Sequence, residues 1–321
     1  MASPLVDAGL LPWADLPYEE QLARKLAFVR GAFERRRIAA PVEAALPSPR
    51  RTGARARLKF QVESGQLGFH RPGTHQFLRP AIDDLARPEI VAAAALLRPT
   101  AGEVELRSDG ERVVVDATAP TRGLPDVAIK GRPVAGNPAL TVDGLRVSPG
   151  AFYQVNLEVN RALVSLVDEW IRGAEALLDL YGGIGNLSRA AHARGTPVTL
   201  VESNPASVAD ARHNLAGAAV IRGDASRFEP GSAVYDVAVL DPPRQGAPGV
   251  LPRVATTRPR AIVYVSCDPV TLARDVAELG NTYEIERAVP LDMFPGTEHV
   301  ECACLLRRTT RGSGPTRTSR R

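Results

Sequence analysis

Residues 176–186, ALLDLYGGIGN, decide the fold class of this chain. The apolar run at residues 176–181 is typical of a buried strand, and the glycines that follow allow a tight turn into a helix. Four later stretches have the same apolar character, with helical segments between them: PVTLVE (197–202), AVIRGD (219–224), YDVAVLD (235–241) and AIVYVSC (261–267). Near-continuous apolar strands that alternate with helices predict a parallel sheet covered on both faces.

The two ends of the chain have a different pattern. Residues 282–294 and 300–308 read as two strands with no helix between them, which predicts an antiparallel hairpin at the edge of a mixed seven-stranded α/β sheet. Residues 1–147 combine a basic amphipathic helix near 18–36 with short strand-like pieces and predict an α+β domain. We therefore expect an α+β domain over 1–147, an α/β domain over 148–307 and a disordered basic tail over 308–321.

Composition limits the classes of protein to which the chain can belong. The 321 residues are 44% hydrophobic, and no apolar run approaches the roughly 18 residues needed to cross a bilayer. The cations are almost all arginine, which suits RNA binding, although a GC-rich genome explains the bias nearly as well. The N-terminus has no basic region typical of a signal peptide, and the three cysteines all follow residue 266. We expect a cytoplasmic, monomeric protein without a membrane contact.

The glycine turn and the next strand end predict a nucleoside pocket. Glu202 ends the second strand, where a carboxylate can bind both ribose hydroxyls of an adenosine. The third glycine of a dinucleotide fingerprint is missing, because Gly185 is followed by Asn-Leu-Ser. S-adenosylmethionine therefore fits this turn better than NAD does. The alternative is that Asp179 and Glu202 only cap helices or lie solvated at strand ends.

Two further strand ends carry side chains that could take part in catalysis. Asp241-Pro-Pro-Arg244 holds a carboxylate rigidly, since proline fixes its own φ and restricts the residue before it. Cys267 lies in Ser266-Cys-Asp-Pro269, at the carboxyl end of a buried strand. A single cysteine beside apolar residues is more often a small packed hydrophobe than a nucleophile.

Six motifs, in order over about residues 148–307, resemble the RNA uracil-5-methyltransferases, which make 5-methyluridine in tRNA and rRNA. They are Phe152-Tyr-Gln-Val-Asn156, Asp179-Leu-Tyr-Gly-Gly-Ile-Gly-Asn186, Glu202-Ser-Asn-Pro205, Asp241-Pro-Pro-Arg244, Ser266-Cys-Asp-Pro269, and Asp292-Met-Phe-Pro followed by His299-Val-Glu301. The resemblance implies a class I, Rossmann-like methyltransferase domain that uses S-adenosylmethionine. It also implies that a thiolate adds to carbon 6 of uracil, so that carbon 5 becomes the nucleophile for the methyl group.

The resemblance assigns roles to individual residues. Cys267 is the implied nucleophile and Glu301 the implied base, with Glu298 as a rival for the base. The implied cofactor-binding residues are Gln154, Tyr181, Asn186, Glu202 and Asp241. Other expectations come from the positions of the residues themselves: His299, two residues from Glu301, should support it by hydrogen bonding, Asp224 at the third strand end should meet an adenine edge, and Cys302 and Cys304 should be packed core. No metal site is expected.

The sequence also departs from the family. Many rRNA-acting members carry a β-barrel RNA-binding domain and a four-cysteine iron–sulfur motif, and we find neither here. The α+β domain over 1–147 is expected to contact the RNA. The target is open, with rRNA favoured over tRNA. Two other functions remain as alternatives: a non-catalytic RNA-binding or RNA-folding protein, and an NAD-dependent oxidoreductase.

Overall fold

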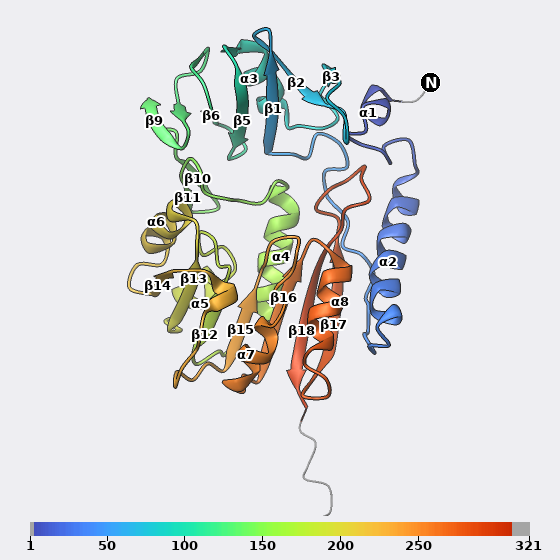
Figure 1. The fold of residues 1–321 in the computed structure, drawn as a ribbon, viewed down its shortest axis with the longest axis vertical. Helices are drawn as coiled ribbons and strands as arrows, with labels where there is room; N and C mark the ends of the chain where they lie inside the picture. The colour runs from blue at the N-terminus through green and yellow to red at the C-terminus, as the bar shows by residue number, and fades with distance from the viewer. Residues whose placement is uncertain (1–2, 310–321) are drawn as a thin grey trace, which may run out of the picture.

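The computed structural model describes residues 3–309, which form two seven-stranded sheets, one above the other in Figure 1. The N-terminal sheet has the strand order β3-β2-β1-β5-β6-β8-β9. The C-terminal sheet has the order β14-β13-β12-β15-β16-β18-β17. A hairpin of β10 (Leu140–Val142) and β11 (Leu145–Val147) lies between the two sheets.

The C-terminal sheet is mixed and seven-stranded, as the sequence predicts. Its strands are β12 (Leu177–Leu180), β13 (Val198–Glu202), β14 (Ala219–Arg222), β15 (Val237–Leu240), β16 (Ala261–Ser266), β17 (Tyr283–Leu291) and β18 (Glu301–Arg308). The first five are parallel, and β18 runs antiparallel to both β16 and β17. The last strand of the chain thus lies inside the sheet, and β17 forms the edge.

Helices cover both faces of this sheet. One face packs against α4 (Leu157–Trp170), α5 (Arg189–Ala193) and α6 (Pro205–Asn214). The other packs against α2 (Tyr18–Arg35), α7 (Val250–Thr256) and α8 (Pro269–Ala277), beside a short 3-10 helix, η1 (Ala225–Arg227). The predicted cap of α4 is confirmed, because the Asn156 side chain accepts a hydrogen bond from the Val159 amide at 3.2 Å.

The N-terminal sheet is antiparallel except where β6 and β8 pair in parallel. Its strands are β1 (Arg57–Glu63), β2 (Gln66–His70), β3 (Phe77–Leu78), β5 (Gly102–Ser108), β6 (Val113–Ala117), β8 (Val127–Ile129) and β9 (Arg132–Ala135). Two short strands, β4 (Arg98–Pro99) and β7 (Thr121–Arg122), pair separately. Helices α3 (Pro88–Leu96) and α1 (Pro4–Asp7) bury Ile90 and Leu5 against this sheet.

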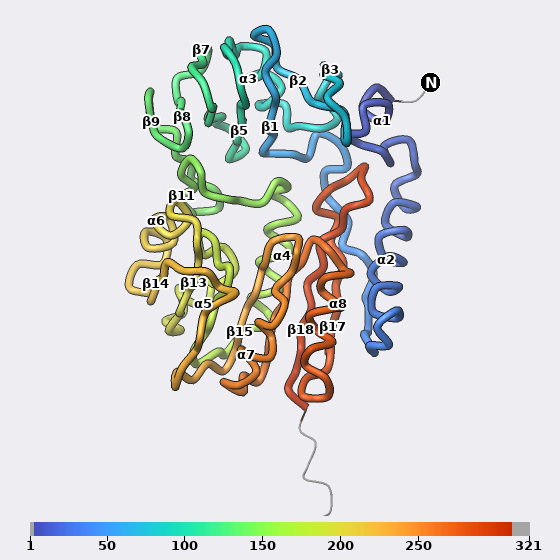
Figure 2. The backbone as a smooth tube through the Cα atoms, viewed as in Figure 1, coloured from blue at the N-terminus to red at the C-terminus, as the bar shows by residue number. Residues whose placement is uncertain are grey.

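Helix α2 belongs to the packing of the C-terminal sheet, although the sequence predicts it within the N-terminal domain. Val29, Ala32 and Phe33 are buried in the core that α7 and α8 share with that sheet. Figure 2 shows the chain running along β17 before it rises to the N-terminal sheet. The predicted division at residue 147 is therefore wrong for this helix. A buried apolar stripe only requires some partner surface, and the sequence does not specify which one.

The segment after α2 protects the exposed edge of the sheet. Val42 and Leu46 form parallel bridges with Ala288 and Leu291 of β17. An unpaired edge strand is a template for aggregation, and a covering segment removes that hazard. The N-terminal segment therefore contacts the C-terminal sheet in two ways, through the packing of α2 and through these bridges to β17.

The C-terminal end of the last strand also differs from the prediction. Arg308, expected to begin a disordered tail, pairs with Tyr283 as the last residue of β18. Thr309 is also described, and its backbone N–H donates to the Thr282 carbonyl at 3.0 Å. Residues 310–321 of the predicted tail lie outside the described residues. Over residues 3–309, no helix is both long and apolar enough to span a membrane.

Candidate active site

The predicted site residues meet at one edge of the C-terminal sheet. Parallel strands end at a common edge, and the registers align Leu180 with Leu240 and Leu240 with Tyr264. The residues that follow these strands therefore lie side by side at that edge. Strand β18 runs the other way, so it begins where its neighbours end.

The register of β16 and β18 brings Cys267 to Glu301. Ser266 pairs with Cys302 in this antiparallel ladder, so the next position along each strand places Cys267 opposite Glu301. The Cys267 side chain is half-buried, whereas Glu301 is buried. Two residues 34 positions apart in sequence thus form one compact pair at the sheet edge.

The electrostatics of this pair follow from burial among like charges. Burial, together with the charges of Glu301 and Asp241, raises the pKa of the Cys267 thiol to about 11. Burial and the Asp241 charge also hold the pKa of Glu301 well above its ordinary value. The site therefore favours protonated acids in the absence of a cation, and a positive charge bound there would lower these pKa values together.

Two aspartates extend the acidic character toward the glycine turn. Asp179 is buried in β12, and neither of its carboxylate oxygens makes a hydrogen bond of normal geometry with residues 3–309, although the nearby Ser188 side chain acts to lower its pKa. Burial raises the pKa of Asp179 to about 7. Burial and the charge of Asp179 likewise raise the pKa of Asp241 to about 7. A buried carboxylate without a partner is costly, so Asp179 is a candidate ligand-binding residue.

The turn after β12 is held in the conformation that the glycines allow. Tyr181 adopts a left-handed φ of 59°, and Gly183 has a φ of 56° with open space where a side chain would project. Glu202 accepts hydrogen bonds from the amides of Gly183 at 3.0 Å and Asn204 at 2.6 Å. These bonds fix the Glu202 carboxylate beside the turn, at the end of the adjacent strand.

Asn186 is placed by a residue that the sequence reasoning missed. Asn160, buried on α4, accepts a hydrogen bond from the Asn186 amide at 2.8 Å. Asn160 also donates to the Tyr153 hydroxyl at 2.9 Å, and Gln154 next to that tyrosine is buried. The signal was present in the sequence as a polar residue on the apolar face of an otherwise amphipathic helix.

The remaining predicted residues have mixed outcomes. Cys302 and Cys304 are fully buried, which confirms them as packed core. His299 is half-buried and meets the Phe294 ring edge-on at a centroid distance of 5.9 Å, and burial lowers the pKa of its imidazole. Asp224 is exposed and caps η1 by accepting from the Ser226 amide, so its expected contact with adenine stays a prediction. No cluster of three or more potential metal ligands occurs in the described part of the chain.

Comparison with known proteins identifies the family. The model of the tRNA (uracil-5-)-methyltransferase family matches residues 231–309. A 23S rRNA (uracil(1939)-C(5))-methyltransferase from Klebsiella pneumoniae strain 342 is 33% identical over 314 residues, covering 83% of this chain and 72% of the relative. This chain belongs to the RNA uracil-5-methyltransferase family. The corresponding Pseudomonas putida KT2440 enzyme is 32% identical over 91% of this chain and 76% of its own length.

Other members of the family match over a smaller part of their length. The 23S rRNA (uracil(1939)-C(5))-methyltransferase from Klebsiella pneumoniae MGH 78578 is 40% identical, but the match spans 43% of that protein. A solved structure covers more of this chain. The Pyrococcus abyssi tRNA (uracil-54, C5)-methyltransferase, in complex with S-adenosyl-L-homocysteine, has a TM-score of 0.74 and 25% identity, covering 95% of this chain and 87% of its own. The predicted class I methyltransferase fold is thereby confirmed.

Proposed function

We propose that this family member methylates carbon 5 of a uridine in RNA, with Cys267 as nucleophile, Glu301 as base and S-adenosylmethionine as methyl donor. The observation that carries the proposal is the register that sets Cys267 opposite Glu301 at the sheet edge. The reaction needs a thiol and a proton acceptor that both reach the same uracil ring, and Cys267 and Glu301 supply them. Both alternatives named above lack a use for this pair.

The residues of the glycine turn fit S-adenosylmethionine. The buried, unpartnered carboxylate of Asp179, the open space at Gly183 and the fixed Glu202 carboxylate form an acidic cradle. Tyr181, Asn186, Gln154 and Asp241 complete the proposed binding set. When bound, S-adenosylmethionine supplies an electrophilic methyl group on a positively charged sulfur. A positive charge there favours the ionised forms of the surrounding acids.

The chain's own groups account for the bond changes on uracil. The Cys267 thiol first loses its proton to solvent, and the thiolate then forms a bond to carbon 6. The electron pair of the carbon 5–carbon 6 double bond becomes available at carbon 5. After carbon 5 has gained the methyl group, the Glu301 carboxylate takes the proton from carbon 5. The pair from that C–H bond restores the double bond, and the Cys267 sulfur leaves carbon 6. The uridine must leave its stack to reach both groups.

The RNA is proposed to approach through a cleft between the two sheets. A cavity of about 460 Å³ is lined by β1, β5 and β6 on one side and by Gly150–Phe152 and Asn204 on the other. Lys59 pairs with Glu103 and Arg57 with Glu105, so carboxylates offset part of the positive charge. We therefore expect RNA bases to bind in this cleft mainly by stacking on aromatic side chains, and less by attraction to a net positive charge. Phe152 is 52% exposed, and the Arg57 guanidinium lies 5.2 Å from its ring centre.

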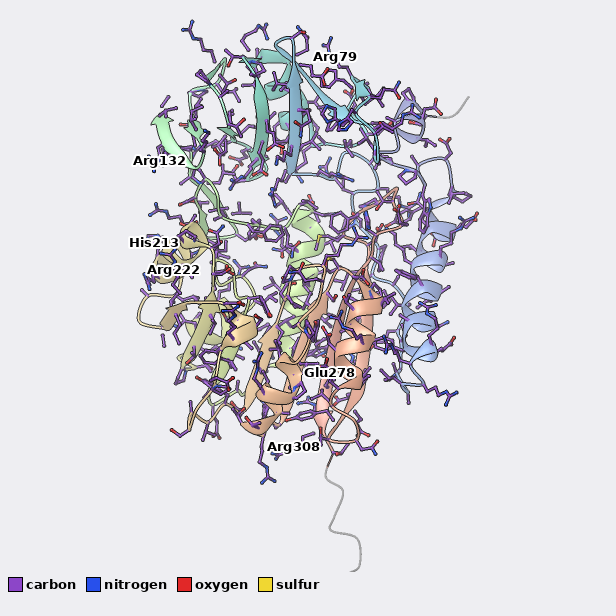
Figure 3. The ribbon with its side chains drawn as sticks, in the orientation of Figure 1. Arg79, Arg132, His213, Arg222, Glu278 and Arg308 are labelled. Atoms are coloured by element: carbon purple, nitrogen blue, oxygen red, sulfur yellow. The ribbon has the colours of Figure 1, made fainter. Side chains whose placement is uncertain are left out.

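Cations close to the proposed active site complement this cleft. The positive charge of Arg244 acts on both Cys267 and His299, and that of Arg55 acts on His299. Exposed arginines elsewhere, such as Arg132 and Arg222, are spread over both halves of the molecule (Figure 3), so they do not mark one binding face. We propose that Arg55 and Arg244 contact the phosphates that flank the target.

The names of the relatives favour rRNA as the substrate. The two relatives that the match covers over 72% and 76% of their own length are both named as 23S rRNA enzymes. The tRNA enzyme stays a second candidate, because the Pyrococcus abyssi structure covers 95% of this chain. Transfer of labelled methyl to 23S rRNA and to tRNA transcripts separates the two.

Trapping of the covalent intermediate tests the proposed reaction. RNA that carries 5-fluorouridine should form a stable methylated adduct on Cys267, because fluorine cannot be removed from carbon 5 as a proton. Cys267→Ala should abolish the adduct and turnover while keeping cofactor binding, and Cys304→Ala is the matched control. An adduct that mass spectrometry places on another residue would refute the assignment.

A further inference from the structure

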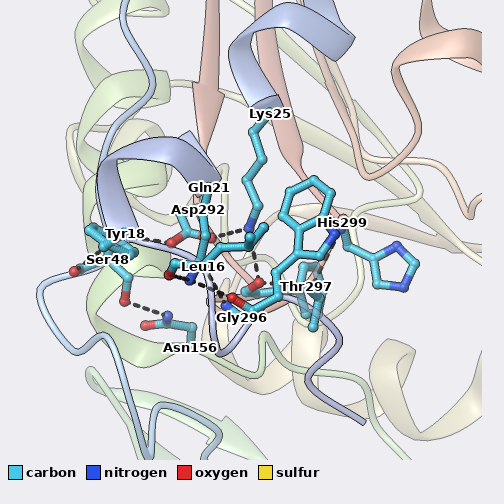
Figure 4. A network of polar contacts seen from close by, with 12 residues as sticks. Leu16, Tyr18, Gln21, Lys25, Ser48, Asn156, Asp292, Gly296, Thr297 and His299 are labelled. Carbon is cyan, nitrogen blue, oxygen red and sulfur yellow. Dashed lines mark hydrogen bonds and ion pairs between the residues drawn. The ribbon is translucent and has the colours of Figure 1, made fainter. Parts of the chain in front are cut away.

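Helix α2 reaches into the loop that connects β17 to β18, residues 292–300, through buried polar side chains (Figure 4). The Lys25 ammonium pairs with the Asp292 carboxylate, and both side chains are 0% exposed. Lys25 also donates to the Phe294 carbonyl at 2.9 Å. The Tyr18 hydroxyl donates to the second carboxylate oxygen of Asp292 at 2.7 Å. One end of the loop is thus bound to two residues of α2.

Gln21 binds the middle of the same loop. Its amide oxygen accepts from the Gly296 backbone N–H at 2.9 Å, while its amide nitrogen donates to the carbonyls of Trp13 and Leu16. The Trp13 backbone N–H in turn donates to the Gly296 carbonyl at 2.8 Å. Both backbone groups of Gly296 are therefore held by the N-terminal segment.

The loop that these residues hold leads directly to Glu301. Leu291 pairs with Glu301 across β17 and β18, so the loop leaves the sheet and returns to it at this pair. Within the loop, Thr297 donates to the Phe294 carbonyl at 2.8 Å, which closes the turn. A shift of the loop would move the start of β18, where the Glu301 carboxylate is attached.

Stability alone does not account for the buried ion pair. The free energy needed to remove two charges from water offsets much of the attraction between them. An apolar pair of similar volume often gives equal or greater stability. What the ionic and amide contacts add is direction, since each bond fixes a particular atom of the loop. This directional restraint acts on the element that carries the proposed base.

We propose that Lys25, Gln21 and Tyr18 are positioning residues, which fix loop 292–300 and through it the Glu301 carboxylate for removal of the carbon 5 proton. The inference rests on the proposed function. It assigns α2 to one step, in which the proton passes from carbon 5 to Glu301 and sulfur leaves carbon 6. Methyl transfer precedes that step and does not use Glu301.

The two steps can be measured separately on one RNA. The substrate is a 23S rRNA or tRNA transcript with tritium at carbon 5 of its uridines. Release of tritium measures proton removal from carbon 5, and a labelled methyl group measures methyl transfer. The variants are Gln21→Met and the double change Lys25→Met with Asp292→Leu, which removes both buried charges together. Arg30→Met, on the exposed face of α2, is the matched control. Thermal unfolding shows whether each variant is folded.

In the wild type and in Arg30→Met, tritium release should keep pace with methyl transfer. In single turnovers of the two α2 variants, tritium release should be at least about tenfold slower than methyl transfer, and a methylated adduct should accumulate on Cys267. A parallel fall of both rates, or wild-type rates in the folded double variant, would overturn the positioning role. Absence of methyl transfer by the wild type to either RNA would instead refute the proposed function itself, and the positioning role with it.

Discussion

Replacement of Asp179 by asparagine should stabilise the cofactor-free protein relative to the wild type, increasingly so as the pH rises. Asp179 is 1% exposed, and its carboxylate oxygens have no partner among the described residues. Burial raises the pKa of Asp179 from 3.8 to about 7. The folded protein therefore holds this proton more tightly than the unfolded chain does. The stability that the proton confers is complete below pH 3.8 and is lost as the pH rises to about 7.

The size of the effect follows from the pKa difference. Each pKa unit corresponds to about 1.4 kcal/mol, so a shift of about three units corresponds to about 4 kcal/mol over the whole window. Between pH 5 and pH 8 the wild type should lose about 2–3 kcal/mol that the asparagine variant keeps. For a chain of this length that is about 5 °C in Tm. The unpaired asparagine amide has its own cost, but that cost does not change with pH.

The assay is thermal unfolding of the cofactor-free proteins in a series of buffers from pH 5 to pH 8. Asp241 titrates in both proteins, and the variant also removes the Asp179 charge that raises the pKa of Asp241. Both changes favour the variant as the pH rises, so the informative quantity is the pH dependence of the difference in Tm between the two proteins. Asp84→Asn, at an exposed position, is the control for a lost carboxylate. A Tm difference between wild type and Asp179→Asn that stays constant from pH 5 to pH 8 would refute the reasoning, since it would mean that Asp179 keeps the same charge in both states.

Three further predictions concern the site and its surroundings. Glu301→Gln should still transfer methyl to natural RNA but accumulate the methylated protein–RNA adduct, seen as a slow band in a denaturing gel; free product at the wild-type rate would argue against Glu301 as base. Gly182→Ala should cost about 1–3 kcal/mol, measured by urea unfolding, because the new Cβ would lie 2.5 Å from the Leu200 Cγ and 2.9 Å from the Asp179 Cγ. Phe152→Ala should raise the KM for RNA about tenfold with kcat unchanged, as expected for the loss of one stacked base, and an unchanged KM would exclude stacking there.

The local features of this protein could be predicted from its sequence. The glycine turn at 182–185, the cap at Asn156 and the apolar strands each depend on residues close together in the chain. Such features are set by backbone preference and hydrophobic pattern, which act over a few residues. The strand ends then indicated where chemical groups such as Cys267 lie.

Contacts between distant segments were decided only by the tertiary structure. The sequence predicts a final hairpin but not that β18 lies beside β16, and this placement is what brings Glu301 to Cys267. Lys25 and Asp292 are 267 positions apart, and nothing in either local pattern identifies the other. An apolar stripe or a buried charge requires a partner without naming it, because burial and pairing energies depend on the surface that the whole fold presents. Sequence alone therefore determined the elements and the candidate site residues, and the packing of the whole chain determined which of them meet.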